Sequence, residues 1–201
     1  MRKVLLLLAA CGLLPAAQAQ TERGSKLLGV SVGELRYARG KFSGASYLGA
    51  ALTPTAAIFV ADNLALGAGL SVAYARQRYN DDWFFRQFGY GLAPVLRYYV
   101  PGGGRHRVFG ELGGEYGRRH SRGTEYRDVI GPPPPERVRR TSVYGYHAAL
   151  GYSFFLAPTA ALEATAGYYR VAHDPIYHPR NIFDVRVGFS VYLPGKGTGQ
   201  N

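Results

Sequence analysis

The sequence predicts an all-β protein: an eight-stranded antiparallel up-and-down β-barrel that spans a membrane. Three observations predict it. First, large apolar residues alternate with small or polar ones in eight segments. Second, the connectors between these segments are alternately short and long. Third, no segment after the first 19 residues is apolar for long enough to form a membrane-spanning helix. The 27 glycines and 16 tyrosines also suit tightly packed strands with many boundaries between apolar and polar surroundings.

The alternation is clearest between residues 64 and 75, where Leu66, Leu70 and Val72 share one face and the other face carries only Ala, Gly and Ser. In the first segment Glu34 falls on the apolar face, so that strand either leaves the bilayer early or contains a β-bulge. The eight predicted strands are Lys26–Tyr37, Leu48–Phe59, Leu64–Ala75, Gln87–Val100, Arg107–Gly117, Tyr144–Phe155, Ala160–Tyr169 and Phe183–Leu193.

The connectors predict which end of the barrel faces which side of the membrane. Short turns are expected at 60–63, 101–106 and 157–159, and long polar loops at 38–45, 76–86, 118–140 and 170–180. Short periplasmic turns, long extracellular loops and an even number of strands are the layout of an outer-membrane barrel. This layout leaves both ends of the barrel chain on the periplasmic side.

The N-terminus has the pattern of a cleaved signal peptide, which we place at residues 1–19. Arg2 and Lys3 precede an apolar run, and Ala17-Gln18-Ala19 is an A-x-A cleavage site. The alternative is a lipoprotein signal, because Leu8-Ala9-Ala10-Cys11 resembles a lipobox. Cleavage after Ala19 would remove the single Cys and lower the formal charge from +11 to 11 − 2 = +9. The barrel domain is then 20–193, followed by a short flexible tail at 194–201.

The composition of the second face of each strand favours a membrane barrel over a soluble one. This face is rich in Gly, Ala and Ser, which suit the narrow lumen of eight strands better than a water-exposed exterior. Aromatic residues also gather near the strand ends, as expected for rings at the two membrane interfaces. They are Tyr74, Tyr90, Tyr116, Tyr144 and Tyr168 at the long-loop end, and Tyr98, Tyr152 and Phe154 at the short-turn end. A soluble sandwich with an aromatic core is the alternative, but it does not explain this placement.

Several stretches resemble the small outer-membrane β-barrel proteins that are related in architecture to the OmpX and OmpW types. They are residues 62–67 (DNLALG), 94–99 (PVLRYY), 109–112 (FGEL) and 160–163 (AALE). The resemblance spans almost all of the chain after the signal peptide and implies a scaffold more than an activity. Many such proteins end on an aromatic residue that the barrel-assembly machinery recognises. Here Leu193 is followed by the tail, so the position of that signal is left open.

Charged residues on the small-residue face predict an ion-pair network inside the lumen. Unpaired ions are costly in a narrow barrel, so these charges are expected to pair and to fill the lumen. The alternative is a polar path for small solutes or protons. The predicted network contains Arg97, Glu111, Glu115, Glu163, Asp184 and Arg186.

The loop at 118–140 is strongly basic, with seven arginines against Glu125, Asp128 and Glu136, a net charge of 7 − 3 = +4. Arginine binds phosphate in a bidentate manner, so contact with lipopolysaccharide in the outer leaflet is a candidate role; a solvated loop is the alternative. Nucleic acid is not an expected partner at the cell surface. The seven arginines are Arg118, Arg119, Arg122, Arg127, Arg137, Arg139 and Arg140.

Two other motifs do not have the spacing of the metal site or the phosphate loop that they suggest. His173, Asp174 and His178 match no standard metal-site spacing, and the glycines at 102–104 lack the lysine–hydroxyl pattern of a phosphate loop. Some barrels of this kind modify lipid A, which needs a serine and a histidine that converge near the outer rim. Ser142 and Tyr144 lie near His120 in sequence, but no such spacing is evident.

We therefore predict a non-enzymatic integral outer-membrane protein with a side-chain-filled lumen and a structural or surface-interaction role. It needs no cofactor or metal and is expected to be monomeric. Its expected partners are outer-membrane lipid, lipopolysaccharide and, during biogenesis, the barrel-assembly machinery. The alternatives are a narrow porin-like channel for small solutes and a lipid A-modifying enzyme.

Overall fold

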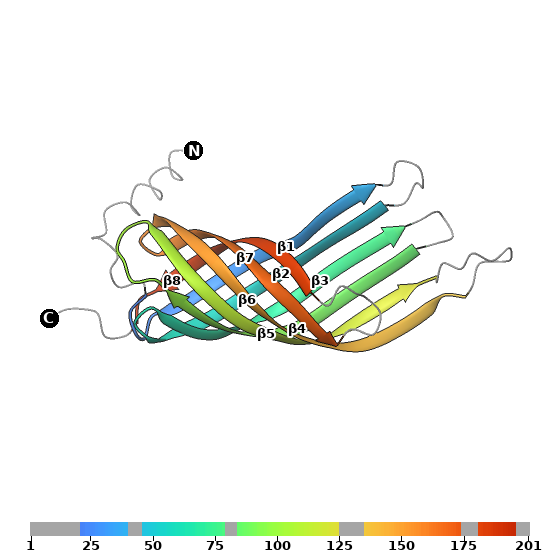
Figure 1. Cartoon of the computed structure of the whole chain (residues 1–201), viewed down its shortest axis with the longest axis horizontal. Helices are drawn as coiled ribbons and strands as arrows, with labels where there is room; N and C mark the ends of the chain where they lie inside the picture. The colour runs from blue at the N-terminus through green and yellow to red at the C-terminus, as the bar shows by residue number, and fades with distance from the viewer. Residues whose placement is uncertain (1–20, 40–45, 79–83, 125–134, 174–180, 196–201) are drawn as a thin grey trace, which may run out of the picture.

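Eight antiparallel strands close into a barrel in the computed structural model, which describes residues 21–39, 46–78, 84–124, 135–173 and 181–195 (Figure 1). Each strand pairs with its neighbours in sequence, and residues 26–32 of the first pair with residues 187–193 of the last to close the sheet. The predicted fold class and strand count are therefore confirmed. The strands are β1 (Lys26–Arg39), β2 (Ser46–Ala61), β3 (Leu64–Arg78), β4 (Phe84–Tyr99), β5 (His106–Gly123), β6 (Arg137–Ala157), β7 (Ala160–His173) and β8 (Asn181–Leu193).

The short turns lie together at one end of the barrel, where β1 begins and β8 ends (Figure 1). Asp62 and Asn63 alone connect β2 to β3, and Asn63 takes a positive φ of 64°, which asparagine tolerates better than most residues. Pro158 and Thr159 connect β6 to β7. Within the part of the chain that the structure describes, no helix is long and apolar enough to cross a membrane.

At the other end, the strands run further than the sequence predicted. The connector between β5 and β6 is residues 124–136, so the predicted loop at 118–140 is wrong at both ends. Arg118 pairs with Ser142 and Arg122 with Val138 in the β5–β6 ladder. The prediction ended each strand where apolar alternation stopped, whereas backbone hydrogen bonds continue a ladder whatever its side chains are. For the same reason β1, β3, β4 and β7 extend into the other predicted loops, and β8 begins two residues before its predicted start.

The structure resolves the alternative left open for the first strand. The β1–β2 register shifts between Gly33 and Arg36, and Glu34 has a positive φ of 51°. This β-bulge resets the alternation, and pairing with β2 continues to Arg39.

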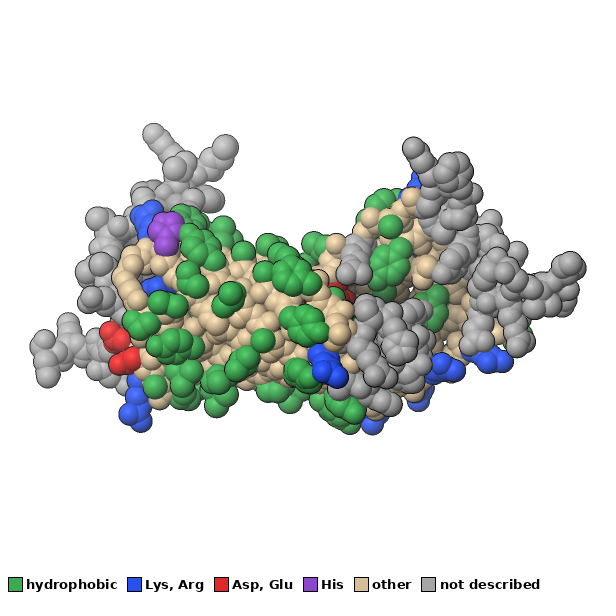
Figure 2. All heavy atoms as spheres, in the orientation of Figure 1, with side chains coloured by type: hydrophobic (Ala, Val, Ile, Leu, Met, Phe, Trp, Pro, Cys, Tyr) green, Lys and Arg blue, Asp and Glu red, His purple; other side chains and the backbone are tan. Residues whose placement is uncertain are grey.

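The two faces of the wall differ as the alternation predicts. In β6, Ala149 and Ser153 are 8% and 0% exposed, whereas the neighbouring Leu150 is 71% exposed. Figure 2 shows hydrophobic side chains spread along the wall on the face in view. Proteins that face water rarely expose a contiguous apolar surface of this kind. A closed barrel can carry it across hydrocarbon because every strand edge is paired.

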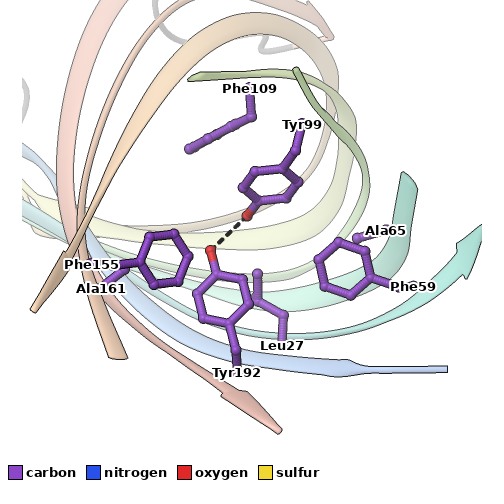
Figure 3. Packing of buried hydrophobic residues seen from close by; sticks show 8 residues of the cluster. All are labelled: Leu27, Phe59, Ala65, Tyr99, Phe109, Phe155, Ala161 and Tyr192. Atoms are coloured by element: carbon purple, nitrogen blue, oxygen red, sulfur yellow. Dashed lines mark hydrogen bonds between the residues drawn. The ribbon is translucent and has the colours of Figure 1, made fainter. Parts of the chain in front are cut away.

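The lumen holds an aromatic core at the short-turn end, which the sequence prediction of a lumen dominated by Gly, Ala and Ser had missed. Tyr99 and Phe109 pack with ring centroids 5.2 Å apart, and Phe155 and Tyr192 with centroids 5.0 Å apart. The rings of Tyr99 and Tyr192 point toward each other from opposite sides of the lumen (Figure 3). The full cluster is Leu27, Phe59, Ala65, Tyr99, Phe109, Phe155, Ala161 and Tyr192.

Candidate functional site

An ion-pair network lies next to the aromatic core, and Arg97 of β4 joins its parts. Arg97 Nη2 donates to Glu111 Oε2 at 2.7 Å, and Arg97 Nη1 donates to Glu163 Oε2 at 2.9 Å. Glu111 lies on the adjacent strand β5, but Glu163 lies on β7, three strands away. The Arg97 side chain therefore reaches across the lumen to hold two carboxylates. Its guanidinium carbon also lies 4.2 Å from the centroid of the Phe109 ring, which links the network to the aromatic core.

The other oxygen of Glu111 is held from further strands. Arg186 Nη2 of β8 donates to Glu111 Oε1 at 2.8 Å, and His147 Nε2 of β6 lies 3.1 Å from the same oxygen. His147 is only 9% exposed and stacks on Tyr169 with ring centroids 4.6 Å apart. The sequence analysis missed His147, although its place between Tyr146 and Ala148 already put it on the lumen face.

Hydroxyl groups satisfy Glu163 and connect the network to the tyrosines. Tyr192 donates to Glu163 Oε1 at 2.8 Å, and Ser153 donates to the same oxygen at 3.1 Å. The hydroxyls of Tyr99 and Tyr192 are 2.9 Å apart, and Arg97 Nη1 donates to the Tyr99 hydroxyl at 3.1 Å. Tyr99 lies on β4 and Tyr192 on β8, which are diametrically opposite strands of an eight-stranded barrel. This contact therefore spans the full width of the lumen.

The remaining two predicted members make hydrogen bonds to other partners. Glu115 accepts a hydrogen bond from the Ser71 hydroxyl at 2.6 Å, and Asp184 accepts one from the Glu34 backbone N–H at 3.4 Å, beside the β1 bulge. The structure thus brings four of the six predicted residues together: Arg97, Glu111, Glu163 and Arg186. We refer to these four, with His147, as the lumen network.

The lumen network is built of matched charges, as a structural plug would be. Two guanidinium groups face two carboxylates, and donors and acceptors are matched within hydrogen-bond distance. Charges that pair and satisfy each other hold side chains in place and offer little field to a passing ion. Among the described residues, no group of three or more His, Cys, Asp or Glu side chains could hold a metal ion. The serine and histidine considered above for lipid A chemistry lie on neighbouring strands. In the β5–β6 ladder, Ser142 lies opposite Arg118, and His120 lies opposite Arg140.

The predicted surface arginines divide between the two faces of the wall. In the strand alternation Arg118, Arg122 and Arg140 point outward, whereas Arg119, Arg137 and Arg139 belong to the lumen-facing positions. Arg127 lies outside the described residues. Strand alternation, which the sequence analysis did not extend past Gly117, is the signal that separates them.

Further arginines join the outward set on the neighbouring strands. Arg86 of β4 lies opposite Arg122, and Arg76 of β3 lies opposite Arg86. Arg122 Nη2 donates to Glu136 Oε2 at 2.9 Å, and Arg122 Nε also contacts this carboxylate. These hydrogen bonds raise the pKa of Arg122 and lower the pKa of Glu136. We call Arg76, Arg86, Arg118, Arg122 and Arg140 the arginine band; with Glu136 it has a net charge of 5 − 1 = +4.

Comparison with known proteins identifies the fold. No family model and none of the curated proteins matches the chain. Among solved structures, a major outer membrane protein from Thermus thermophilus superposes with a TM-score of 0.55 at 16% identity, over 84% of this chain and 99% of that one. The chain has the fold of an outer-membrane β-barrel. Matches also include OprG from Pseudomonas aeruginosa (TM-score 0.49, 12% identity, 88% of this chain and 99% of that one). Another is Ail of Yersinia pestis (TM-score 0.45, 13% identity, 85% of this chain and 99% of that one). The resemblance drawn from the sequence is confirmed at the level of the fold.

Proposed function

We propose that this protein is a non-enzymatic, monomeric integral outer-membrane barrel with a closed lumen, which works through the outer surface of its extracellular end. The observation that carries the closed lumen is the 2.9 Å contact between the Tyr99 and Tyr192 hydroxyls, on side chains that are 0% and 1% exposed. Because these strands are diametrically opposite, the pair leaves no straight path for a hydrated ion between them. The lumen network adds a second layer of side chains that reach across the lumen.

Outer-membrane location is supported by the apolar exterior, by the fold, and by connectors that are short at one end of the barrel and longer at the other. The Tyr90 and Tyr116 rings, 45% and 64% exposed, point outward at one interface, and the Tyr98 and Tyr152 rings, 49% and 41% exposed, at the other. Such aromatic girdles are typical of barrels in this membrane. The predicted signal peptide at 1–19 lies outside the described residues, and mass spectrometry of the mature N-terminus tests cleavage after Ala19.

Conductance across a planar lipid bilayer tests the closed lumen. The refolded wild-type protein is expected to show no stable open state, because the cross-lumen contacts are fully made. Replacing both tyrosines with alanine (Tyr99→Ala with Tyr192→Ala) removes the contact and is expected to produce brief conducting events. A stable, nanosiemens-scale pore in the wild type would refute the closed lumen and favour the narrow channel. In that channel, Arg97→Ala or Glu111→Ala should change ion selectivity.

Two simple assays test the remaining parts of the proposal. An unboiled sample should migrate differently from a boiled one on a denaturing gel, because a closed barrel resists detergent until it is heated. Lipid A extracted from cells that do and do not express the protein should have the same mass spectrum. A new lipid A species that depends on expression would overturn the non-enzymatic assignment.

A further inference from the structure

A groove crosses the outer wall of β3, β4 and β5 toward the long-loop end. It has a volume of about 500 Å³, and its sides are Leu70, Val72, Leu92, Tyr90 and Tyr116, with Arg118 at its rim. These side chains occupy outward positions, and they are half exposed: Leu70 is 59% exposed and Leu92 is 54% exposed. The groove therefore lies on the surface that the proposed function turns toward lipid.

The floor of the groove is formed by a close approach of two strand backbones. Gly91 of β4 lies opposite Gly117 of β5 in the ladder. A Cβ atom on Gly117 would lie 2.4 Å from the Tyr90 carbonyl oxygen, and one on Gly91 would lie 2.8 Å from the Tyr116 carbonyl oxygen. Larger residues at these positions would push β4 and β5 apart, so glycine keeps the groove as it is.

The arginine band begins at the rim of this groove and continues away from it. Arg118 is two residues beyond Tyr116 on β5, and Arg122 is four residues further on the same face. Arg86 lies on the same face of β4, beyond Tyr90 and Phe88. An apolar cleft thus meets a cationic surface at the level of the aromatic girdle, where the acyl chains of a lipid meet its headgroup.

We propose that the groove and the arginine band together bind one phosphorylated glycolipid of the outer leaflet. An acyl chain lies in the groove, and the phosphates are held by Arg118 and its neighbours in the band. Guanidinium groups match phosphate oxygens geometrically, and they are held here by a rigid sheet and not by a loop. This inference rests on the proposed membrane orientation and adds the class of ligand and its site.

The charge of the band distinguishes this ligand from the other candidates for the groove. A second copy of the chain would bring the same positive band against the first, which is electrostatically unfavourable. A zwitterionic phospholipid has one phosphate with an ammonium group beside it, and so complements a net charge of +4 less well than two phosphates do.

Native mass spectrometry of the refolded, detergent-solubilised protein tests the site by titration with defined lipids. The probes are bis-phosphorylated lipid A, the same lipid A after removal of both phosphates, and phosphatidylethanolamine. The wild type is expected to bind one molecule of bis-phosphorylated lipid A in preference to the other two. Arg118→Gln should weaken this binding about tenfold, the scale of one charge-assisted hydrogen bond. Glu136→Gln should strengthen it, because it releases Arg122.

Matched control variants separate the site from general effects of charge or size. Arg139→Gln removes an exposed arginine at a lumen-facing position of the same barrel end and should leave the affinity unchanged. Leu70→Trp fills the groove and should weaken binding, whereas Leu162→Trp makes the same change on β7, outside the groove, and should not.

Two results would overturn the proposal: equal affinities of Arg118→Gln and Arg139→Gln for lipid A, or an affinity that does not depend on the phosphates. Either would leave the closed outer-membrane barrel intact if the gel shift and the absence of conductance are observed. A protein without the gel shift would instead refute the proposed function, and the inference with it.

Discussion

Glutamine has nearly the same shape as glutamate, but replacing Glu111 with glutamine is expected to lower the stability of the barrel strongly. Glu111 is 4% exposed and accepts hydrogen bonds from Arg97 at 2.7 and 3.0 Å and from Arg186 at 2.8 Å. Glutamine removes the negative charge and turns an amide N–H₂ group toward these donors. Among the described residues, Glu163 is then the anionic partner that Arg97 keeps, and Arg186 loses the Glu111 carboxylate that it contacts.

The cost follows from the two guanidinium groups that would be left undercompensated in the lumen. Removing one partner of a buried ion pair typically costs about 3–5 kcal/mol. With a slope of about 2 kcal/mol per molar urea, this corresponds to a shift of the unfolding midpoint of about 2 M. The assay is urea unfolding of the protein refolded into lipid vesicles, followed by tyrosine fluorescence and by the gel shift.

Glu115→Gln is the matched control, because it makes the same change four residues along on the same face of β5. Glu115 is exposed and accepts a hydrogen bond from Ser71, so its loss should cost about 0–1 kcal/mol. If Glu111→Gln and Glu115→Gln shift the midpoint equally, the lumen network does not stabilise the barrel, and the plug interpretation fails.

Three further changes and one control have clear expectations. Gly117→Ala places a Cβ atom 2.4 Å from the Tyr90 carbonyl oxygen and should destabilise the barrel by about 1–3 kcal/mol, the usual cost of overpacking, in the same urea assay. Gly110→Ala on the same strand meets nothing within 4 Å and should be neutral or slightly stabilising; a loss equal to that of Gly117→Ala would contradict the argument. Phe109→Ala removes a fully buried ring that packs against Tyr99 and should cost about 3–5 kcal/mol, measured by the same midpoint. Tyr192→Phe keeps the ring but removes the donor to Glu163, so we expect a smaller loss of about 1 kcal/mol. A loss as large as that of Phe109→Ala would contradict this expectation, because the hydroxyl would then contribute as much as a buried ring.

The number of strands, their order and the side chains that face outward could be predicted from the sequence, because each depends on a local regularity. A membrane barrel places lipid on one face and a narrow lumen on the other, so every strand within the bilayer repeats the same two-residue pattern. Leu66, Leu70 and Val72 show this pattern in β3, and all three lie on the exposed face. The short turn at Asp62 and Asn63 is equally local.

The ends of the strands could not be predicted in this way, because the pattern fades where the wall leaves the bilayer. At Arg118 and Arg122 both faces meet polar surroundings, and only backbone pairing continues the strand. The arginines were therefore assigned to a loop. Strand alternation separates them into outward and lumen-facing sets, but it applies only once the strand is known to continue past Gly117.

The partners inside the lumen depend on distances across the barrel, which no local pattern encodes. The sequence predicted that Arg97, Glu111, Glu163 and Arg186 share a face, but it could not predict that Asp184 would instead lie beside the β1 bulge. The aromatic core was missed for the same reason. Tyr99 and Tyr192 stand 93 positions apart in sequence, and only the closure of the barrel brings their hydroxyls together.

The distribution of charge relates the two sites to each other. In the lumen network two arginines meet two glutamates, so the network is close to neutral and its donors and acceptors satisfy each other. On the outer surface, the arginine band contains five arginines, and the acidic residue that lies beside it is Glu136. Within the described part of the chain, the positive charge of the band is therefore not balanced. A balanced interior stabilises the wall, and an unbalanced exterior attracts anions. The proposed glycolipid uses this unbalanced charge, because its phosphates would meet the band at the outer surface. Glu111→Gln changes neither the band nor the groove, since Glu111 faces the lumen. It should therefore lower the stability of the barrel more than it lowers the preference of the folded protein for bis-phosphorylated lipid A.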